Sequence, residues 1–149
     1  MADGWNFADV WETVAQACPG RPAQLHGAET ISWRAFDEHA NGLATQLLQA
    51  GLGHQDKVAL YLHNGLAYLQ CAFACLKVSM VPVNTNYRYQ HEELHYLWDN
   101  ADAAAVVFHG SFTDTVAALR ARCAKVRLWI HVDDGTQPCP DWATPYALA

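Results

Sequence analysis

Short apolar segments alternate with amphipathic ones along most of the chain. Four short segments have the pattern of strands: 58–62, 80–83, 104–108 and 126–132. The first is almost wholly apolar, as expected of a strand that is covered on both faces of a sheet. Apolar residues recur at helical spacing in the segments between these four: 66–78, 92–100 and from Ser111 to Cys123. This alternation predicts an α/β fold, with a mainly parallel sheet and helices on both of its faces.

The first third of the chain adds a short helix and a hairpin to this prediction. Asn6 or Asp9 can open a helix that runs to about Ala17. Segments 23–26 and 30–32 have the pattern of two short strands joined by a tight turn.

Capping residues mark the ends of further helices. Ser32 can cap a helix whose apolar positions repeat as far as Leu48, and Gly51 suits the left-handed position just past its end. Ser111 can cap the last helix, with Asp114 at the third position as in a capping box.

The sequence predicts a single domain followed by a short irregular segment. Residues 1–132 carry all of the predicted helices and strands, so we expect one α/β domain there. Residues 133–149 are rich in Gly, Pro and Asp, which is typical of a loop or a truncated tail.

Composition and charge exclude several classes of protein. A hydrophobic fraction of 52% is too high for a disordered chain, and a net charge of -6 disfavours nucleic-acid binding. The N-terminus lacks the basic start and apolar run of a secretory signal, and the most apolar segment, 66–76, is too short to span a bilayer. The five cysteines show no framework spacing, so we expect free thiols in a cytoplasmic protein.

The segment from His91 to His95 matches the H-E-x-x-H pattern of zinc hydrolases. On a helix the two histidines would share a face and bind zinc, with Glu92 as general base. However, Trp98 and Ala101 stand where a third-ligand motif would need Gly and His, and acidic residues suit a helix N-terminus for electrostatic reasons alone. A zinc hydrolase is therefore the least favoured alternative, and we predict no metal ligands.

A polar cluster directly follows the predicted strand 80–83. It contains Asn84, Asn86, Tyr87 and Arg88. Ligands of open α/β sheets bind at the carboxyl ends of strands, so we predict that these four residues contact substrate at the lip of a cleft. The alternative is a well hydrogen-bonded loop.

Ser111 follows His109 and Gly110 at a predicted strand-to-helix turn, where a serine nucleophile can stand. Helix capping is enough to explain it, and the sequence identifies no acid–base partner. We therefore predict no catalytic residue.

Several segments carry a family resemblance through their order and spacing. They are ISWRAF at 31–36, GLGHQDKVALYL at 51–62, LKVSMVPVNTNYR at 76–88 and ELHYL at 93–97. From about Phe7 to Trp142 the chain resembles the start of an acyl-CoA synthetase of the adenylate-forming (AMP-binding) superfamily. The segments VNTNYRY and YLWDNAD are most similar to bacterial fatty-acyl or sterol-side-chain CoA ligases.

The resemblance implies the first subdomain of the adenylate-forming fold and a parent enzyme that uses ATP, CoA, Mg²⁺ and a small acyl substrate. A carboxylate and ATP would give an acyl-adenylate, and CoA would then take the acyl group. The family's phosphate loop, its adenine- and ribose-binding motifs and its C-terminal lysine are missing from this sequence. We therefore expect an N-terminal fragment that binds none of these ligands and is inactive alone. A free-standing α/β binding module, self-associating through exposed apolar surface, is the main alternative.

The sequence departs from the family pattern at three turns or caps. Ala35 replaces the usual Glu, so Ser32 loses its capping-box partner. Ser79 and Gln55 each stand where Gly is usual. If the backbone at these two positions has positive φ, each side chain adds strain on the order of 1 kcal/mol.

Overall fold

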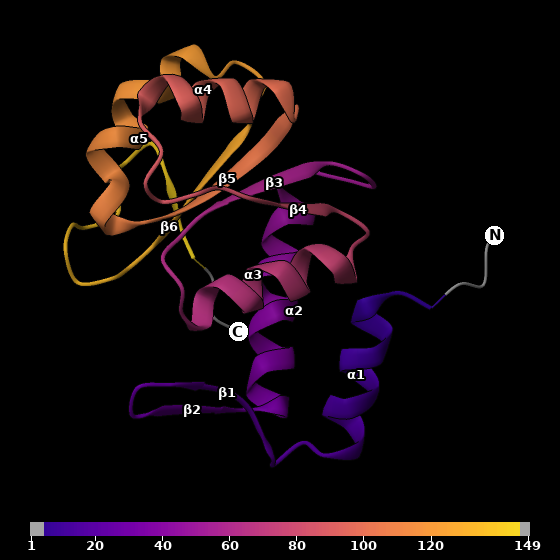
Figure 1. Ribbon diagram of the computed structural model, residues 1–149. Helices are drawn as coiled ribbons and strands as arrows, with labels where there is room; N and C mark the ends of the chain where they lie inside the picture. The colour runs from indigo at the N-terminus through magenta and orange to yellow at the C-terminus, as the bar shows by residue number, and fades with distance from the viewer. Residues whose placement is uncertain (1–4, 147–149) are drawn as a thin grey trace.

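The computed structural model describes residues 5–146, and Figure 1 shows their arrangement. Residues 1–4 of the predicted domain and 147–149 of the predicted tail lie outside the described residues. The helices are α1 (Phe7–Ala17), α2 (Trp33–Gln49), α3 (Leu66–Lys77), α4 (His91–Asn100) and α5 (Thr113–Leu119), with 3-10 turns η1 (Gly110–Phe112) and η2 (Arg120–Arg122). The strands are β1 (Pro22–His26), β2 (Glu29–Ser32), β3 (Lys57–Tyr61), β4 (Val81–Asn84), β5 (Ala103–His109), β6 (Leu128–Val132) and β7 (Thr144–Pro145).

The main sheet has the strand order β4-β3-β5-β6-β7, and every neighbouring pair in it is parallel. β1 and β2 form a separate antiparallel hairpin. All carboxyl ends of a parallel sheet lie at one edge, so the segments that follow β3, β5 and β6 meet there. The predicted mainly parallel sheet is confirmed.

Helices cover both faces of the sheet, as predicted. In Figure 1, α4 and α5 lie on one side of the sheet, and α2 and α3 lie on the other with α1 beside them. Successive strand residues alternate between two cores: Val58 and Leu60 of β3 pack with the first three helices, and Ala59 and Tyr61 pack with α4 and α5. Among the described residues no helix is both long enough and apolar enough to cross a membrane.

Lys77 joins the three helices on one side of the sheet. Its side chain is only 7% exposed, and its Nζ forms ion pairs with Glu12 of α1 and Asp37 of α2, the latter at 2.7 Å. The same ammonium group lies 4.5 Å from the centre of the Phe73 ring. Because a buried charge is costly without partners, these contacts are what allow a lysine between the helices.

The helix caps follow the sequence predictions at three of four sites. Asn6 and Asp9 form a reciprocal capping box at the start of α1. The Ser32 hydroxyl accepts the backbone N–H of Ala35 at 3.2 Å, without the return bond that a Glu at position 35 would make. Gly51 has a φ of 81° just past α2, as expected.

The predicted cap at Ser111 is wrong. The chain leaves β5 through the 3-10 turn η1, and α5 starts only at Thr113, with no side-chain cap at Phe112. The carboxylate of Asp134 accepts a hydrogen bond from the backbone N–H of Ser111 instead. The Ser111 hydroxyl is thereby left to face the neighbouring loop.

The segment after residue 132 contains one strand pair that the sequence did not predict. Thr144 and Pro145 form β7, which extends the sheet beside β6. The backbone N–H of Tyr146 also donates to the carbonyl of His131 at 2.8 Å. A strand of only two residues leaves no recognisable pattern in the sequence, and its pairing depends on contacts with β6. The division at residue 132 stays a prediction.

Three non-glycine residues at the amino edge of the sheet adopt the left-handed conformation, and two of them, Gln55 and Ser79, stand where the family pattern has glycine, whereas the third is Asp102. Gln55 has a φ of 66° and Ser79 a φ of 57°. The two turns are joined, because the backbone N–H of Gln55 donates to the carbonyl of Ser79 at 2.8 Å. The positive φ suspected from the missing glycines is confirmed at both sites.

We predict that Ser79→Gly stabilises the protein by about 0.5–1 kcal/mol. Glycine removes the Cβ strain of a positive φ, and this gain exceeds its larger loss of backbone entropy on folding. Urea unfolding measures the change as a higher midpoint at unchanged slope. Ser79→Ala is the matched control, because it removes the hydroxyl but keeps the Cβ. An equal gain in both variants would show that strain is not the cause.

Candidate functional site

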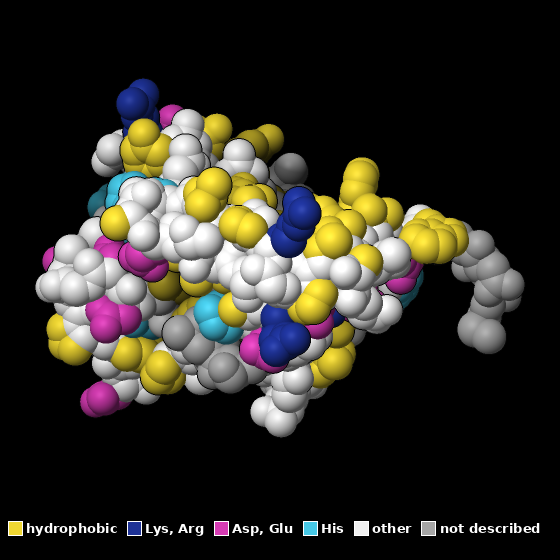
Figure 2. Space-filling model, turned by 90° about the horizontal axis from the view of Figure 1, so that it is seen from below, with side chains coloured by type: hydrophobic (Ala, Val, Ile, Leu, Met, Phe, Trp, Pro, Cys, Tyr) yellow, Lys and Arg dark blue, Asp and Glu magenta, His cyan; other side chains and the backbone are white. Residues whose placement is uncertain are grey.

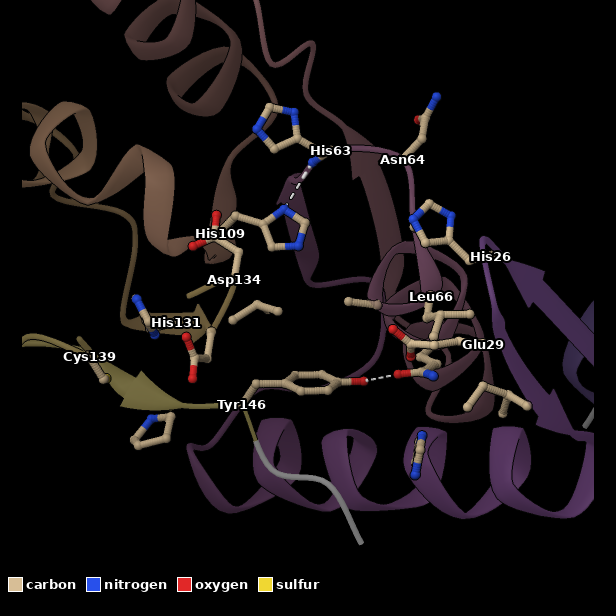
Figure 3. A pocket seen from close by; sticks show the side chains of 18 of the residues that line it. His26, Glu29, His63, Asn64, Leu66, His109, His131, Asp134, Cys139 and Tyr146 are labelled. Atoms are coloured by element: carbon tan, nitrogen blue, oxygen red, sulfur yellow. Dashed lines mark hydrogen bonds between the residues drawn. The ribbon is translucent and has the colours of Figure 1, made fainter. Parts of the chain in front are cut away.

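A cavity of about 940 Å³ opens at the carboxyl edge of the sheet (Figure 3). Its walls come from the hairpin, α2, the start of α3, three strand ends and the segment after β6. Histidines dominate the polar part of this lining: His26, His39, His63, His109 and His131. Glu29, Asp133 and Asp134 add carboxylates, and the lining that the structure describes contains no Lys or Arg. The cavity is therefore unsuited to an anionic ligand when its histidines are neutral.

The loops after β3 and β5 are joined by two histidines. The backbone N–H of His63 donates to Nδ1 of His109 at 3.0 Å (Figure 3). An imidazole nitrogen that accepts a hydrogen bond carries no proton, so His109 is neutral and its Nε2 bears the hydrogen. Burial lowers the pKa of His109, and this outweighs the opposite influence of Asp134, while nearby His63 and His131 lower it further.

Asp134 joins the loop after β6 to the end of β5. Its Oδ2 accepts the backbone N–H of Ser111 at 3.0 Å, and its Oδ1 accepts from the hydroxyl and the backbone N–H of Thr136. Partial burial disfavours its charge, but these hydrogen bonds outweigh burial and lower the pKa of Asp134 well below its usual range. Gly110 is required beside it, because a Cβ there would lie 2.7 Å from Asp134 Oδ1.

A chain of buried amides holds the floor of the cavity. The Tyr146 hydroxyl donates to Oε1 of Gln70 at 2.9 Å, and Nε2 of Gln70 donates to Oε1 of Gln24 at 3.1 Å. Nε2 of Gln24 then donates to the carbonyl of Leu66 at 3.0 Å. This relay ties the hairpin, α3 and the segment after β7 together. Burial raises the pKa of Tyr146, so its hydroxyl stays protonated.

The four residues predicted as a substrate-binding lip lie at the same edge but outside the lining of this cavity. Asn84 accepts the hydroxyl of Tyr68 at 2.9 Å, and Asn86 accepts the backbone N–H of Arg88 at 3.0 Å. The Arg88 guanidinium lies 5.5 Å from the centre of the exposed Tyr87 ring. Ligand contact by these residues stays a prediction.

Tyr87 connects the predicted lip to the cavity. Its ring centre lies 5.1 Å from that of His63, which lines the cavity. The structure thus brings the loop after β4 next to the ends of β3 and β5. The hydrogen bonds of Asn84 and Asn86 are with Tyr68 and Arg88 instead.

The H-E-x-x-H segment forms the start of α4, and His91, Glu92 and His95 do not line the cavity. Glu92 is held by Arg122 through two hydrogen bonds of 2.7 and 3.0 Å, so its carboxylate is engaged in an ion pair. Nε2 of His95 lies 3.3 Å from the carbonyl of Arg122. Within residues 5–146 no group of three or more His, Cys, Asp or Glu side chains is placed to hold a metal. The structure gives the zinc alternative no support.

Sequence reasoning missed most of the residues at this edge. It applied the carboxyl-end rule to β4 alone and did not use His63, His109 or Asp134. The same rule, applied to every predicted strand, would have pointed to all three, because each ends or follows a buried strand. Cys71 and Cys75 are fully buried in α3, where they act as small core residues.

The open parallel sheet, covered on both faces and hollowed at its carboxyl edge, defines the class of α/β proteins that bind ligands at strand ends. The comparisons with known proteins name the family within this class. The sequence profile described as AMP-binding enzyme matches residues 11–146. The chain belongs to the AMP-binding enzyme family, as the resemblance predicted.

Several relatives and solved structures that are similar to this chain are named as CoA ligases or synthetases. A Medium/long-chain-fatty-acid--CoA/3-oxocholest-4-en-26-oate--CoA ligase of Mycobacterium marinum is 35% identical over 136 residues, which are 91% of this chain and 25% of the relative. A 3-oxocholest-4-en-26-oate--CoA ligase of Rhodococcus rhodochrous is 31% identical over 131 residues, covering 88% and 24%. Acetoacetyl-CoA synthetase from Streptomyces lividans aligns with a TM-score of 0.89 at 21% identity, over 95% of this chain and 24% of that one, and so supports the fold. The chain spans about a quarter of the length of its curated relatives.

We predict that His109 makes the fold less stable in acid. Its pKa in the folded protein is below the ordinary value of 6.5, so the unfolded chain binds more protons as the pH falls below that value. The stabilisation by the neutral ring is complete above about pH 6.5 and is lost as the pH falls through the folded pKa. Urea unfolding at about pH 7.5 and about pH 5 measures this loss.

His109→Asn is the informative variant, because its amide oxygen can accept the His63 N–H but does not titrate. It should lose less stability between the two pH values than the wild type. The exposed His54→Asn serves as the control and should behave as the wild type does. Identical pH dependence in the wild type and in His109→Asn would contradict the prediction.

Proposed function

We propose that this chain is the N-terminal subdomain of an ATP-dependent acyl-CoA ligase and acts in it as scaffold and as part of one cleft wall. The supporting observation is the family match over residues 11–146, together with 35% identity to a ligase named for fatty-acid and 3-oxocholestenoate substrates. A protein of this kind acts on small soluble cofactors, and we propose that it works in the cytoplasm with its cysteines reduced.

The proposed reaction has two steps. The carboxylate of a fatty or sterol-derived acid attacks the α-phosphorus of ATP, so that an acyl–phosphate bond forms and pyrophosphate leaves. The thiol of CoA, losing its proton, then attacks the acyl carbon and displaces AMP. Both steps need positive groups around phosphate oxygens.

The described residues do not provide such groups at the cavity. Its lining has three carboxylates and, among the residues described, no Lys or Arg. Asp133 and Asp134 both accept N–H groups of their own turn, so they are a poor donor set for Mg²⁺. We therefore propose that ATP, CoA and Mg²⁺ bind mainly to other parts of the enzyme, and that this chain alone is inactive.

The loop after β4 is the part of this chain that we propose to contact substrate. Asn84, Asn86, Tyr87 and Arg88 present amides, an aromatic ring and a cation at the carboxyl edge. Asn86, Tyr87 and Arg88 are exposed, so a ligand can reach them without a rearrangement of the core. The guanidinium of Arg88 suits an anionic or carbonyl oxygen of the substrate or of CoA.

The alternative is a self-associating module, which exposed apolar side chains favour. Trp5, Phe7 and Leu25 are each more than 70% exposed. In Figure 2 the hydrophobic side chains gather mainly toward the N-terminal end of the visible face, and elsewhere they alternate with polar and charged ones. Size-exclusion chromatography separates the two possibilities, because the module should elute as a concentration-dependent oligomer.

We predict that the 149-residue chain releases no pyrophosphate from ATP in the presence of octanoate or 3-oxocholest-4-en-26-oate and CoA. A chimera in which residues 11–146 replace the matching segment of the Mycobacterium marinum relative should release pyrophosphate. The unchanged relative is the positive control. Pyrophosphate release by the chain alone would refute the claim of inactivity, and a folded but inactive chimera would refute the scaffold role.

We predict that Arg88→Met in the same chimera lowers kcat/KM about tenfold, because a hydrogen bond to a charged group contributes about 1.5 kcal/mol. Arg34→Met, an exposed arginine on α2, is the matched control and should leave kcat/KM unchanged. Steady-state kinetics with varied acyl substrate and varied CoA shows which of the two Arg88 contacts. Equal kinetics for both variants would exclude Arg88 from the substrate lip.

A further inference from the structure

Ser111 stands where a buried strand passes into a helix at the carboxyl edge of the sheet. β5 ends at His109, the 3-10 turn η1 follows, and α5 starts at Thr113. The serine is exposed, and its Oγ lies 3.3 Å from Nε2 of His63. The two residues are 48 positions apart in the sequence, and the pairing of β3 with β5 brings them together. The acid–base partner that the sequence did not reveal is thus supplied by the fold.

The imidazole of His63 is held by packing on several sides. Its ring centre lies 4.6 Å from that of Phe112, 5.1 Å from Tyr87 and 5.6 Å from His109. Its backbone N–H is fixed by Nδ1 of His109. A base that is already oriented toward the hydroxyl loses little entropy when proton transfer occurs.

We propose that Ser111 and His63 form a nucleophile and general base that take an acyl group from an activated acyl donor, such as an aryl ester, a thioester or an acyl-adenylate. A serine within hydrogen-bond reach of an oriented histidine is the general requirement for this chemistry. Strand-to-helix turns at the carboxyl edge of a sheet expose such serines in α/β hydrolases. The inference does not rest on the proposed ligase function.

The step is an ordinary acyl transfer. Oγ of Ser111 attacks the carbonyl carbon of the donor while its proton passes to Nε2 of His63. The bond from the acyl carbon to the leaving oxygen or sulfur breaks, and an ester forms on Ser111. The leaving group departs with the electron pair, and the imidazolium returns its proton to the leaving group or to water.

Asp134 sets the expected speed of this reaction. The backbone N–H of Ser111 donates to Oδ2 of Asp134, so it is not free to stabilise the negative oxygen that develops on the donor. Loss of one such donor costs about 10²- to 10³-fold in rate. We therefore expect stoichiometric acylation of Ser111 within minutes to hours, with slow release of the acyl group.

The test uses the full 149-residue chain and p-nitrophenyl butyrate. Absorbance follows release of p-nitrophenolate, and mass spectrometry of the intact chain and its peptides locates the butyryl group. The wild type should gain one butyryl group on Ser111, and Ser111→Ala should gain none there. His63→Gln should slow the labelling of Ser111 about 10²-fold or more, because general base catalysis contributes that much. Ser79→Gly changes another exposed serine and should label as the wild type does.

Peptide mapping separates the proposed site from reactive thiols. Cys18 and Cys139 are partly exposed and can also take a butyryl group, but as thioesters that neutral hydroxylamine removes. Labelling confined to cysteines, or equal labelling of Ser111 in the wild type and in His63→Gln, would overturn the proposal. The readout is independent of pyrophosphate, so this proposal and the ligase proposal can fail separately.

A second variant tests the pair even if ester labelling is slow. In Ser111→Cys, the adjacent imidazole should shift the pH profile of alkylation by iodoacetamide to lower pH, because an imidazolium stabilises a thiolate. Adding His63→Gln should move the profile back toward that of an ordinary thiol. Identical profiles in the single and double variants would show that His63 does not act on residue 111.

Discussion

The position of β3 between two parallel neighbours is the constraint on which the rest of this structure depends. It pairs with β4 on one side and β5 on the other, and Val58, Ala59 and Leu60 at its centre are almost completely buried. A parallel pair cannot be joined by a tight turn, so the chain must cross a face of the sheet after each strand. Such crossovers are right-handed, which places α3 on one face and α4 on the other. The two cores and the shared carboxyl edge follow from this single arrangement.

The two edges of the sheet are held together by different chemistry. At the amino edge Asp56 accepts the backbone N–H of Gly53 and a 2.7 Å hydrogen bond from Arg127, beside the strained turns at Gln55 and Ser79. These contacts of Asp56 tie the turn before β3 to Arg127 before β6. At the carboxyl edge the neutral imidazole of His109 and the carboxylate of Asp134 hold the loops instead.

The sequence predicted the elements of the fold well and their mutual contacts poorly. Buried strands are recognisable because their apolar runs are local, and Asn6 and Gly51 are recognisable because capping chemistry is local. The contact of His63 with His109 and Ser111 depends on β3 lying next to β5 rather than only next to β4. Strand order is not a property of periodicity, so no single-sequence pattern reveals it. For the same reason the sequence predicts Ser111 as a helix cap. In the structure its backbone N–H donates to Asp134, and its hydroxyl lies within hydrogen-bond distance of His63.

The ligase reaction and the Ser111–His63 pair make different demands on this edge, and one chemical species connects them. Adenylation of a carboxylate needs positive groups, which this cavity does not offer among the described residues. Attack by a serine on an activated carbonyl needs a general base within reach and access for the donor, and Ser111 is exposed with its Oγ 3.3 Å from Nε2 of His63. An acyl-adenylate is such an activated carbonyl. If this chain contributes to a cleft in which acyl-adenylates form, the enzyme must either keep them from Ser111 or transfer acyl groups to it. The orientation of His63 by Tyr87, Phe112 and His109 then matters for the fate of the intermediate, because a base that is held in place makes the serine reactive whenever the carbonyl comes within reach.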